Sequence, residues 1–385
     1  MIKCTAIVSA IVLMLTAALT GCANVDGETA NRSSDDVSMS ASDTSSNPVE
    51  FTSAVGEVDE EEFPTKCKIY KQKPKIFTEE QLLVFFSEAS ERTYYSERNL
   101  TVFTAETERG NTDGTNLNFS TDAGILCNMA FDTVGTIYEG EQVKNASLAF
   151  ATIDEVLEEI RKKMIEFGFA SDKWFVDKVY TLTKDDLERY KEATYNAILD
   201  NPYSLDEGEI QNQIEYADKV KQYPSKDSYF ISFGFKLDDI KIFAGGNLTY
   251  GGDAFYSILG SRCKICYSED GFESIMISNV CETDTYEDVE IIAPDKAKEL
   301  INKKYSDIIF EGEVKVNSME LVYLPIPQND LGDYQNKFET RPSYAFYCTV
   351  TEEFYGEMIS KDIVTYFDAV TGDEIAARTV SNMGG

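Results

Sequence analysis

The hydrophobic pattern is clearest between residues 153 and 167. Apolar side chains recur there every three or four positions, the period of a helix with one buried face: Ile153, Val156, Leu157, Ile160, Met164 and Phe167. Thr152 and Glu155 form a capping box before this run, and Gly168 follows it. The pattern predicts a helix that begins after Thr152, ends at Gly168 and packs on a core.

Three other helix starts are visible along the chain. Thr78 and Gln81 form a second capping box, and Thr183 to Asp186 opens a third helix. Pro294 stands where the first turn of a helix tolerates proline. The helix that it opens is expected to turn four side chains toward the core: Ala297, Leu300, Ile301 and Tyr305.

Runs rich in Tyr, Phe, Ile and Val predict strands in the second half, at 228–235, 262–267, 272–280, 314–323, 344–350 and 363–367. Asp270-Gly271 marks a hairpin turn between the second and third of them. The acidic run 282–290 is interpreted as a solvated face or loop. Together the elements predict an α+β fold of two lobes, each an antiparallel sheet with helices packed on one face.

Composition changes along the chain suggest its divisions. Residues 1–21 resemble a signal peptide, and residues 22–63, rich in Ser, Asp, Thr and Glu, predict a disordered acidic tether. Residues 64–200 form the predicted N-terminal lobe, and residues 226–385 the predicted C-terminal lobe. The segment 201–225, punctuated by proline, is the predicted linker between the lobes.

The first residues predict where the protein is located. Ala6 to Leu19 is a mostly apolar run after Lys3, too short for a bilayer that needs about 20 residues. Leu19-Thr20-Gly21-Cys22 then resembles the lipobox of bacterial lipoproteins. The resemblance implies a diacylglyceryl group on Cys22 and an extracytoplasmic protein anchored to the cell membrane by that lipid. The alternative is ordinary cleavage that leaves a bare thiol at Cys22.

Charge and the missing imidazole exclude several functions. The chain has 35 Lys and Arg against 68 Asp and Glu, a formal net charge of -33, which argues against nucleic acid and against anionic lipid headgroups as partners. It has no histidine, so Ser-His-Asp and Cys-His catalysis and histidine-ligated zinc are excluded. Carboxylate chemistry, Ser-Lys dyads, oxygen-ligated calcium and thiols stay open.

Six of the eight cysteines lie beyond the predicted lipid site, and Cys263-x-x-Cys266 is the most suggestive pair. A redox pair sits at a helix N-terminus, whereas residues 262–267 predict a strand, on which these positions point to opposite faces. Zinc would need a second close pair. We therefore favour packing, or a structural disulfide among Cys263, Cys266 and Cys281, and predict no metal site and no cofactor. Trp174 is interpreted as a core residue, with a ligand groove as the alternative.

The end of the chain carries a short motif. Asp368-Ala369-Val370-Thr371-Gly372-Asp373-Glu374-Ile375 resembles the "D-A-x-T-G-E-[IV]" terminus of PepSY modules, with Asp373 inserted. The helix near 294 and the following strands extend this likeness over residues 288–376. The whole layout resembles uncharacterised lipoproteins of clostridial-type Gram-positive bacteria, and distantly the YycH/YycI regulators of a cell-wall sensor kinase. The resemblance implies binding or regulation and identifies no functional residue.

These observations favour a non-catalytic binding or regulatory lipoprotein whose partner is a peptide, a wall component or a membrane protein. The alternative is a histidine-free hydrolase at the cell surface that uses carboxylates. A passive surface or spacer protein is the third class. A pocket with convergent Asp or Glu would favour the hydrolase, and a shallow groove along a sheet edge would favour the binder.

Overall fold

In the computed structural model, most of the described residues lie in three β-sheets, with few helices. Residues from Pro48 onward form one compact unit. The described residues are 49–51, 63–75, 77–78, 80–81, 84–85, 91–97, 100–107, 115–120, 125–128, 146–189, 225–244, 248–250, 256–258, 260–278, 280–306, 312–328, 337–354, 357–375, 377–379 and isolated positions between 192 and 218.

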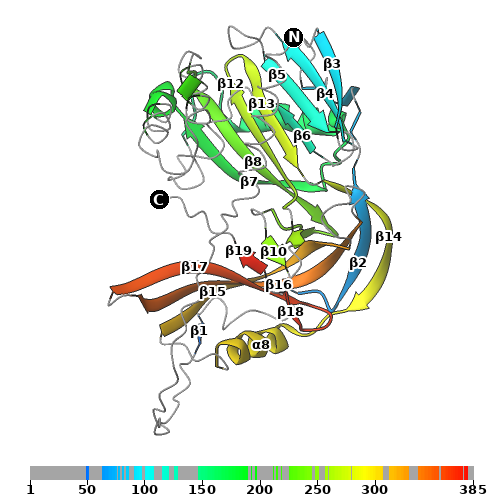
Figure 1. The fold of residues 1–385 in the computed structure, drawn as a ribbon, viewed down its shortest axis with the longest axis vertical. Coiled ribbons are helices and arrows are strands. Elements are labelled where there is room, and N and C mark those ends of the chain that lie inside the picture. Colours follow the sequence, from blue (N-terminus) through cyan, green and yellow to red (C-terminus); the bar gives the residue numbers. More distant parts are fainter. Residues whose placement is uncertain are drawn as a thin grey trace. The chain divides into compact units, whose positions relative to one another are not determined.

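A nine-stranded sheet joins strands from two distant parts of the chain (Figure 1). Every pairing in it is antiparallel, and β9 (Ile240–Lys241) pairs with β8. Its main order is β3 (Glu91–Glu97), β4 (Leu100–Thr107), β5 (Thr115–Ser120), β6 (Ile125–Asn128), β13 (Gly271–Ser278), β12 (Arg262–Ser268), β8 (Ser228–Leu237) and β7 (Trp174–Leu182).

A seven-stranded sheet contains the longest strands of the described chain. All of its pairings are antiparallel except that of β1 with β15. Its order is β1 (Glu50–Phe51), β15 (Gly312–Pro327), β16 (Phe338–Phe354), β17 (Glu357–Asp368) and β18 (Glu374–Ile375), with β2 (Lys66–Pro74) beside β16 and β14 (Cys281–Glu290) beside β2. A small third sheet consists of β11 (Tyr256–Ile258), β10 (Leu248–Tyr250) and β19 (Ala377–Thr379).

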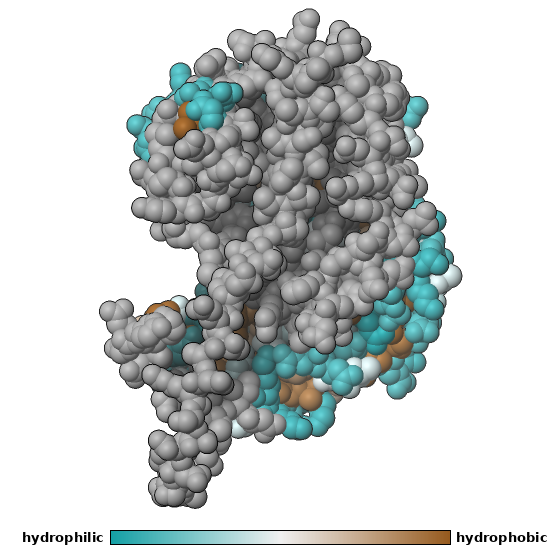
Figure 2. All heavy atoms as spheres, in the orientation of Figure 1, coloured by the Kyte–Doolittle hydropathy of each residue, from teal (hydrophilic) through white to brown (hydrophobic). Residues whose placement is uncertain are grey.

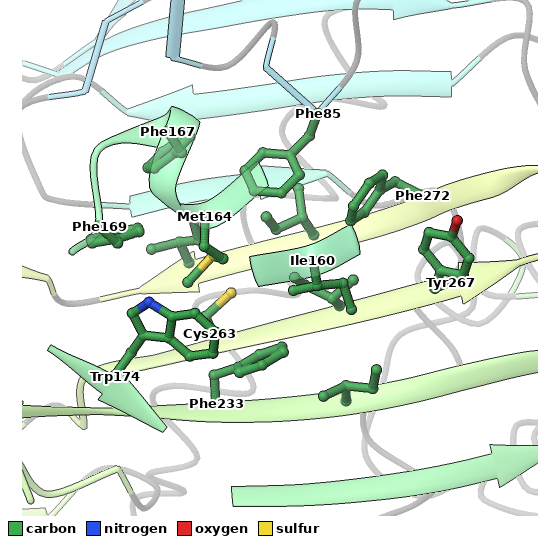
Figure 3. Close-up of a cluster of buried hydrophobic side chains, with 14 of the residues drawn as sticks. Phe85, Ile160, Met164, Phe167, Phe169, Trp174, Phe233, Cys263, Tyr267 and Phe272 are labelled. Carbon is green, nitrogen blue, oxygen red and sulfur yellow. The ribbon is translucent and has the colours of Figure 1, made fainter. Parts of the chain in front are cut away.

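The helix α5 (Ile153–Phe167) has the predicted ends and the predicted buried face. Thr152 and Glu155 form both bonds of the capping box, and Gly168 adopts the left-handed conformation at φ 107°. Its buried side chains belong to the same core as residues of β8, β12 and β13. Figure 3 shows Met164 of this helix near Trp174 and Cys263, so Trp174 is a core residue.

The helix α8 (Pro294–Ser306) follows its prediction as well. Ala297 and Ile301 are fully buried in a core that also contains residues of β15, β16 and β17. Leu300 and Tyr305 pack against that core from its margin. The helix therefore belongs to the seven-stranded sheet, as the order of elements in the sequence indicated.

The predicted division into lobes at residues 201–225 is wrong, because both sheets combine strands from the two sides of it. β6 pairs with β13 in one sheet, and β2 pairs with β14 and β16 in the other. The prediction assumed that elements adjacent in sequence belong to one lobe. Strands far apart in sequence can nevertheless pair by backbone hydrogen bonds. A sheet-rich α+β fold is what the chain adopts.

The acidic run 282–290 forms strand β14, so a loop there is wrong, although its side chains are solvated as expected. Its neighbour β2 is rich in lysine. Lys66 lies opposite Glu290 and Lys68 opposite Asp288, and Lys73 forms ion pairs with Glu282 at 3.1 Å and with Asp284 at 3.3 Å. Opposite charges across a strand pair stabilise the pairing. The run is thus the complement of a basic strand about two hundred residues earlier.

Candidate functional site

The predicted site residues lie in separate places. Leu19, Thr20, Gly21 and Cys22 are outside the described residues. No described helix is long and apolar enough to cross a membrane. Among the described residues, no three His, Cys, Asp or Glu side chains gather closely enough to hold a metal ion.

Cys263 and Cys266 lie on opposite faces of β12. Cys263 belongs to the core beneath α5, and Cys266 to a second cluster with Tyr180 and Phe230. Both are free thiols, so no disulfide joins any two of Cys263, Cys266 and Cys281. A bridge between Cys263 and Cys266 is prevented because positions i and i+3 of a strand face opposite ways, which leaves packing as the role of these two residues.

Burial disfavours the thiolate form of these cysteines. It raises the pKa of Cys263, and it raises the pKa of Cys266 and of Cys281 to about 12. A nucleophilic or redox cysteine needs a pKa lowered toward neutrality, since only the thiolate reacts. The three cysteines therefore have the opposite electrostatics from a thiol active site.

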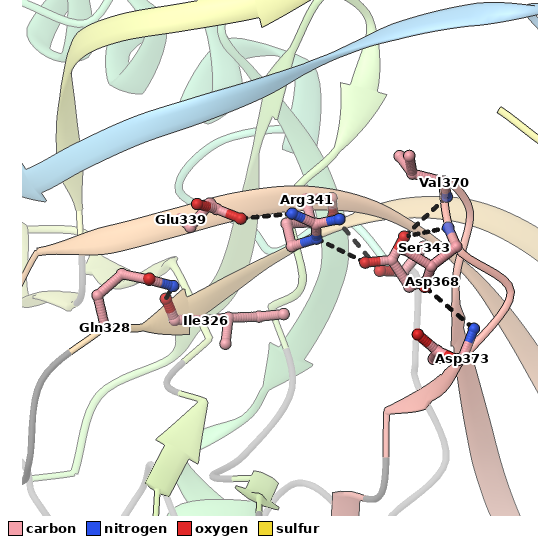
Figure 4. Close-up of polar contacts among 9 residues, drawn as sticks. Ile326, Gln328, Glu339, Arg341, Ser343, Asp368, Val370 and Asp373 are labelled. Atoms are coloured by element: carbon pink, nitrogen blue, oxygen red, sulfur yellow. Dashed lines mark hydrogen bonds and ion pairs between the residues drawn. The ribbon is translucent and has the colours of Figure 1, made fainter. Parts of the chain in front are cut away.

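Asp368 of the C-terminal motif organises the turn between β17 and β18 (Figure 4). Its Oδ2 accepts a hydrogen bond from Arg341 Nε at 2.5 Å, and Glu339 pairs with the same guanidinium. Its Oδ1 accepts the backbone N–H groups of Val370 at 2.7 Å and Thr371 at 3.0 Å. One buried carboxylate thus holds both a strand neighbour and the turn backbone.

The conformation of the turn explains the glycine at position 372 of the motif. Gly372 has φ 77°, a conformation that glycine adopts without strain, and its N–H donates to the carbonyl of Asp368 at 2.8 Å. Burial lowers the pKa of Arg341, but the hydrogen bonds to Asp368 and Glu339 outweigh it and raise the pKa overall. Arg341 therefore stays charged at all physiological pH values. The network is a fixed ion pair whose role is to hold the turn.

A second polar cluster joins the two large sheets at the turn between β8 and β9. Asp238 Oδ2 accepts hydrogen bonds from Tyr70 OH of β2 at 2.5 Å and from Lys68 Nζ at 2.8 Å. Tyr323 OH of β15 accepts the backbone N–H of Lys68 at 3.3 Å. Asp238 and Asp239 have φ 46° and 64°, a left-handed turn that Asp tolerates better than most residues.

The ionisation of this cluster is fixed near neutral pH. The hydrogen bond from Lys68, followed by that from Tyr70, lowers the pKa of Asp238. Burial, followed by the bond to Asp238, raises the pKa of Tyr70. Efficient general acids and bases have pKa values near the working pH. A charged carboxylate held between an ammonium and a neutral phenol is instead a stable clamp between two sheets.

The outer edge of β17 carries exposed apolar side chains next to backbone groups without a strand partner among the described residues. β18 pairs with Tyr366 and Phe367, and no described strand pairs with the outer side of residues 357–365. Met358 is 63% exposed and Ile359 42% exposed. Among the coloured atoms of Figure 2, hydrophilic residues predominate and apolar residues form smaller patches. An unpaired edge with apolar side chains is a template for another strand.

Two other edges are less suited to binding. β14, the last strand beyond β2, exposes Glu282, Asp284, Glu287, Asp288 and Glu290, and such charges discourage strand addition. A described segment already lies beside one end of β7, where Thr181 Oγ1 donates to the carbonyl of Ala146 at 2.7 Å. Within the described residues, β17 therefore combines an open backbone with apolar side chains.

The fold is similar to that in the crystal structure of an uncharacterised protein from Eubacterium rectale, with a TM-score of 0.56 and 15% sequence identity. The match covers 80% of this chain and 86% of that chain. At this identity the likeness concerns the fold alone. Neither a protein-family model nor a curated protein sequence matches the chain.

Sequence reasoning missed both Asp238 and the β17 edge. Asp238-Asp239 is a polar pair between two apolar runs, a signal for a two-residue hairpin turn. The strand was expected only from Ile363, whereas β17 begins at Glu357. Met358 and Ile359, two residues after Gly356, were the available sign of an earlier start. A local sequence pattern does not show which strands pair with a given edge.

Proposed function

We propose that this protein is an extracytoplasmic lipoprotein, anchored by Cys22, which captures an extended polypeptide segment along the outer edge of β17. The observation that carries the proposal is the outer side of residues 357–365, which pairs with no described strand and exposes Met358 and Ile359. Main-chain hydrogen bonds to an edge supply affinity, and alternate side chains supply specificity. The role is binding or regulation without catalysis.

The chemistry of the described polar clusters supports this choice over a hydrolase. The carboxylates of Asp368 and Asp238 are engaged by internal partners. The two carboxylates of a glycosidase must converge on one substrate bond instead. The tyrosines Tyr323 and Tyr347, with pKa values raised by burial to about 12, also stay protonated at neutral pH.

The anchor and the finer architecture complete the proposal. Leu19-Thr20-Gly21-Cys22 would be processed so that a diacylglyceryl group on Cys22 holds the folded part at the outer face of the cell membrane. We further propose that residues 288–376 are a PepSY-like regulatory module and that each large sheet carries its helices on one face. The acidic tether then separates the binding edge from an anionic membrane surface.

The test is a crosslinked pull-down from intact membranes with the full-length chain. Ile359→Lys places a charge on the open edge, and Ile165→Lys is the matched control, since Ile165 is 51% exposed on α5. A partner recovered with the wild type and the control, but reduced about tenfold with Ile359→Lys, supports capture at β17. Equal recovery with both variants would overturn it.

The anchor has its own measurement. Mass spectrometry of the membrane-extracted protein should find acyl chains on an N-terminal Cys22, and Cys22→Ser should leave the protein unacylated and release it from washed membranes. A bare thiol at Cys22, or a cytosolic wild-type protein, contradicts the lipoprotein proposal.

A further inference from the structure

We propose that the segment captured by the β17 edge is β17 of a second copy of this chain, paired antiparallel about a two-fold axis at Lys361. The inference rests on the proposed function, because it names the occupant of the same edge. Closed two-fold dimers use one surface patch on both subunits, so the patch must complement itself. The open stretch of β17 meets this condition residue by residue.

The limits of the open edge are symmetric about Lys361. β16 ends at Phe354 and β17 begins at Glu357, so the hairpin connection lies immediately before the stretch. β18 occupies the edge at Tyr366 and Phe367, immediately after it. The nine residues between these limits have Lys361 at their centre. In a two-fold pair, each copy's hairpin connection would therefore lie where the other copy's β18 ends, at Ile375.

The chemical pattern of the stretch is also symmetric about Lys361. Reading outward in either direction gives one polar residue, two apolar residues and another polar residue: Ser360, Ile359, Met358 and Glu357 on one side, and Asp362, Ile363, Val364 and Thr365 on the other. Antiparallel pairing about Lys361 places like with like at every position. Apolar cross-strand pairs contribute roughly 0.2–1 kcal/mol each.

The paired side chains extend existing cores. Ile359 would lie opposite Ile363 of the second copy, and Ile363 packs on the core beneath α8. Met358 would lie opposite Val364 of the second copy, which packs on the cluster containing Tyr366 on the other face of the sheet. Met358 and Ile359 point to opposite faces of the sheet, and each would thus be covered by an apolar side chain of the second copy.

The central position is compatible with pairing because its charge is already compensated. Lys361 Nζ lies 2.5 Å from Glu352 Oε1 on the neighbouring strand. In the dimer, the two copies of Lys361 would lie opposite each other, each paired with its own Glu352. The four charges together would be neutral. The Lys361 side chain is 52% exposed, so water screens what repulsion is left.

Other two-fold registers pair less well. Because side chains alternate between faces, the two-fold axis must pass through a residue rather than between residues. An axis at Ser360 would place Ile359 opposite Lys361 and Met358 opposite Asp362. An axis at Asp362 would place Ile363 opposite Lys361. Only the axis at Lys361 pairs apolar residues with apolar residues along the whole stretch.

The register is tested by single-cysteine variants of the full-length chain, oxidised in membranes and run on non-reducing gels. Lys361→Cys places two thiols directly opposite each other, about 4.5–5.5 Å apart between Cα atoms and within disulfide reach. Ser360→Cys is the matched control, because its two copies would be about 8 Å apart, beyond that reach. The wild type controls for the native cysteines.

We expect a disulfide-linked dimer from Lys361→Cys at about ten times the yield from Ser360→Cys or the wild type. Coexpression of Ser360→Cys with Asp362→Cys should restore the dimer, since these positions face each other in this register. Because every copy is strongly acidic, salt should increase the yield. Equal yields from Lys361→Cys and Ser360→Cys would overturn the inference. If capture in the pull-down still depends on Ile359, the proposed function survives that result; if it does not, both fail.

Discussion

At the scale of single residues, two aspartates each accept several hydrogen bonds and so connect separate segments of the chain. Asp368 accepts from two consecutive backbone amides and from Arg341, and Asp238 accepts from a tyrosine and a lysine of another sheet. In each case one carboxylate connects segments that are distant in sequence. Removing it would leave several donors without an acceptor, which costs more than the bond itself.

Asp368→Ala should therefore destabilise the protein by about 3–5 kcal/mol, the usual result of removing one partner from a buried ion pair. The exposed loop residue Asp172 provides the control, and Asp172→Ala should stay within about 0.5 kcal/mol of the wild type. Chemical denaturation followed by tryptophan fluorescence measures both. A loss under about 1 kcal/mol for Asp368→Ala would mean that Arg341 and the turn are held by other contacts.

At the scale of elements, strand pairing depends on close contacts that a hydrophobicity pattern does not reveal. Gly234 of β8 lies opposite Phe175 of β7, and the aromatic ring covers the glycine. A Cβ atom at Gly234 would lie 2.4 Å from the ring of Phe175. The glycine lets the ring lie flat on the strand, a way of protecting glycine within a sheet.

Gly234→Ala should therefore destabilise the protein by about 1–3 kcal/mol through overpacking. Phe175→Leu alone should cost less, and it should recover part of the stability in the double variant, because the clash involves only these two residues. Thermal unfolding of the three variants gives the coupling. Strict additivity would show that the ring moves aside without cost.

At the scale of the molecule, the two large sheets are connected by β2 and by the clamp around Asp238. Tyr70 of β2 donates to Asp238 and lies against Tyr323, with ring centroids 5.4 Å apart. Phe243 N–H donates to the carbonyl of Tyr323 at 2.8 Å, a second link between the same sheets. The connection thus combines aromatic packing with a charged hydrogen-bonded centre.

The clamp should make stability depend on pH in the acid range. The pKa of Asp238 is lowered in the folded protein, so its contribution is present above the unfolded pKa of about 3.9 and is lost as the pH falls through the folded value. Because the Asp238 side chain is 44% exposed, the contribution is about 1 kcal/mol or less. The difference in unfolding free energy between the wild type and Asp238→Asn should shrink below pH 4; a constant difference would contradict the clamp.

Local features of this protein were predictable from sequence because they arise from nearby residues. The capping box at Thr152, the buried stripe of α5 and the left-handed Gly372 each involve backbone within a few positions. The same holds for the turn at Asp270-Gly271 between β12 and β13. In these cases the interacting groups are held together by the chain itself, so the pattern is sufficient.

The sequence by itself determined the helices α5 and α8, most of the strands in the second half, the excess of acidic residues and the exclusion of imidazole chemistry. Only the tertiary structure decided that β6 joins β13, that the acidic β14 pairs with the lysines of β2, and that residues 357–365 form an open edge. Strand pairing is made by backbone groups that every residue carries, and its choice depends on which surfaces become buried together. Such a choice belongs to the folded chain as a whole.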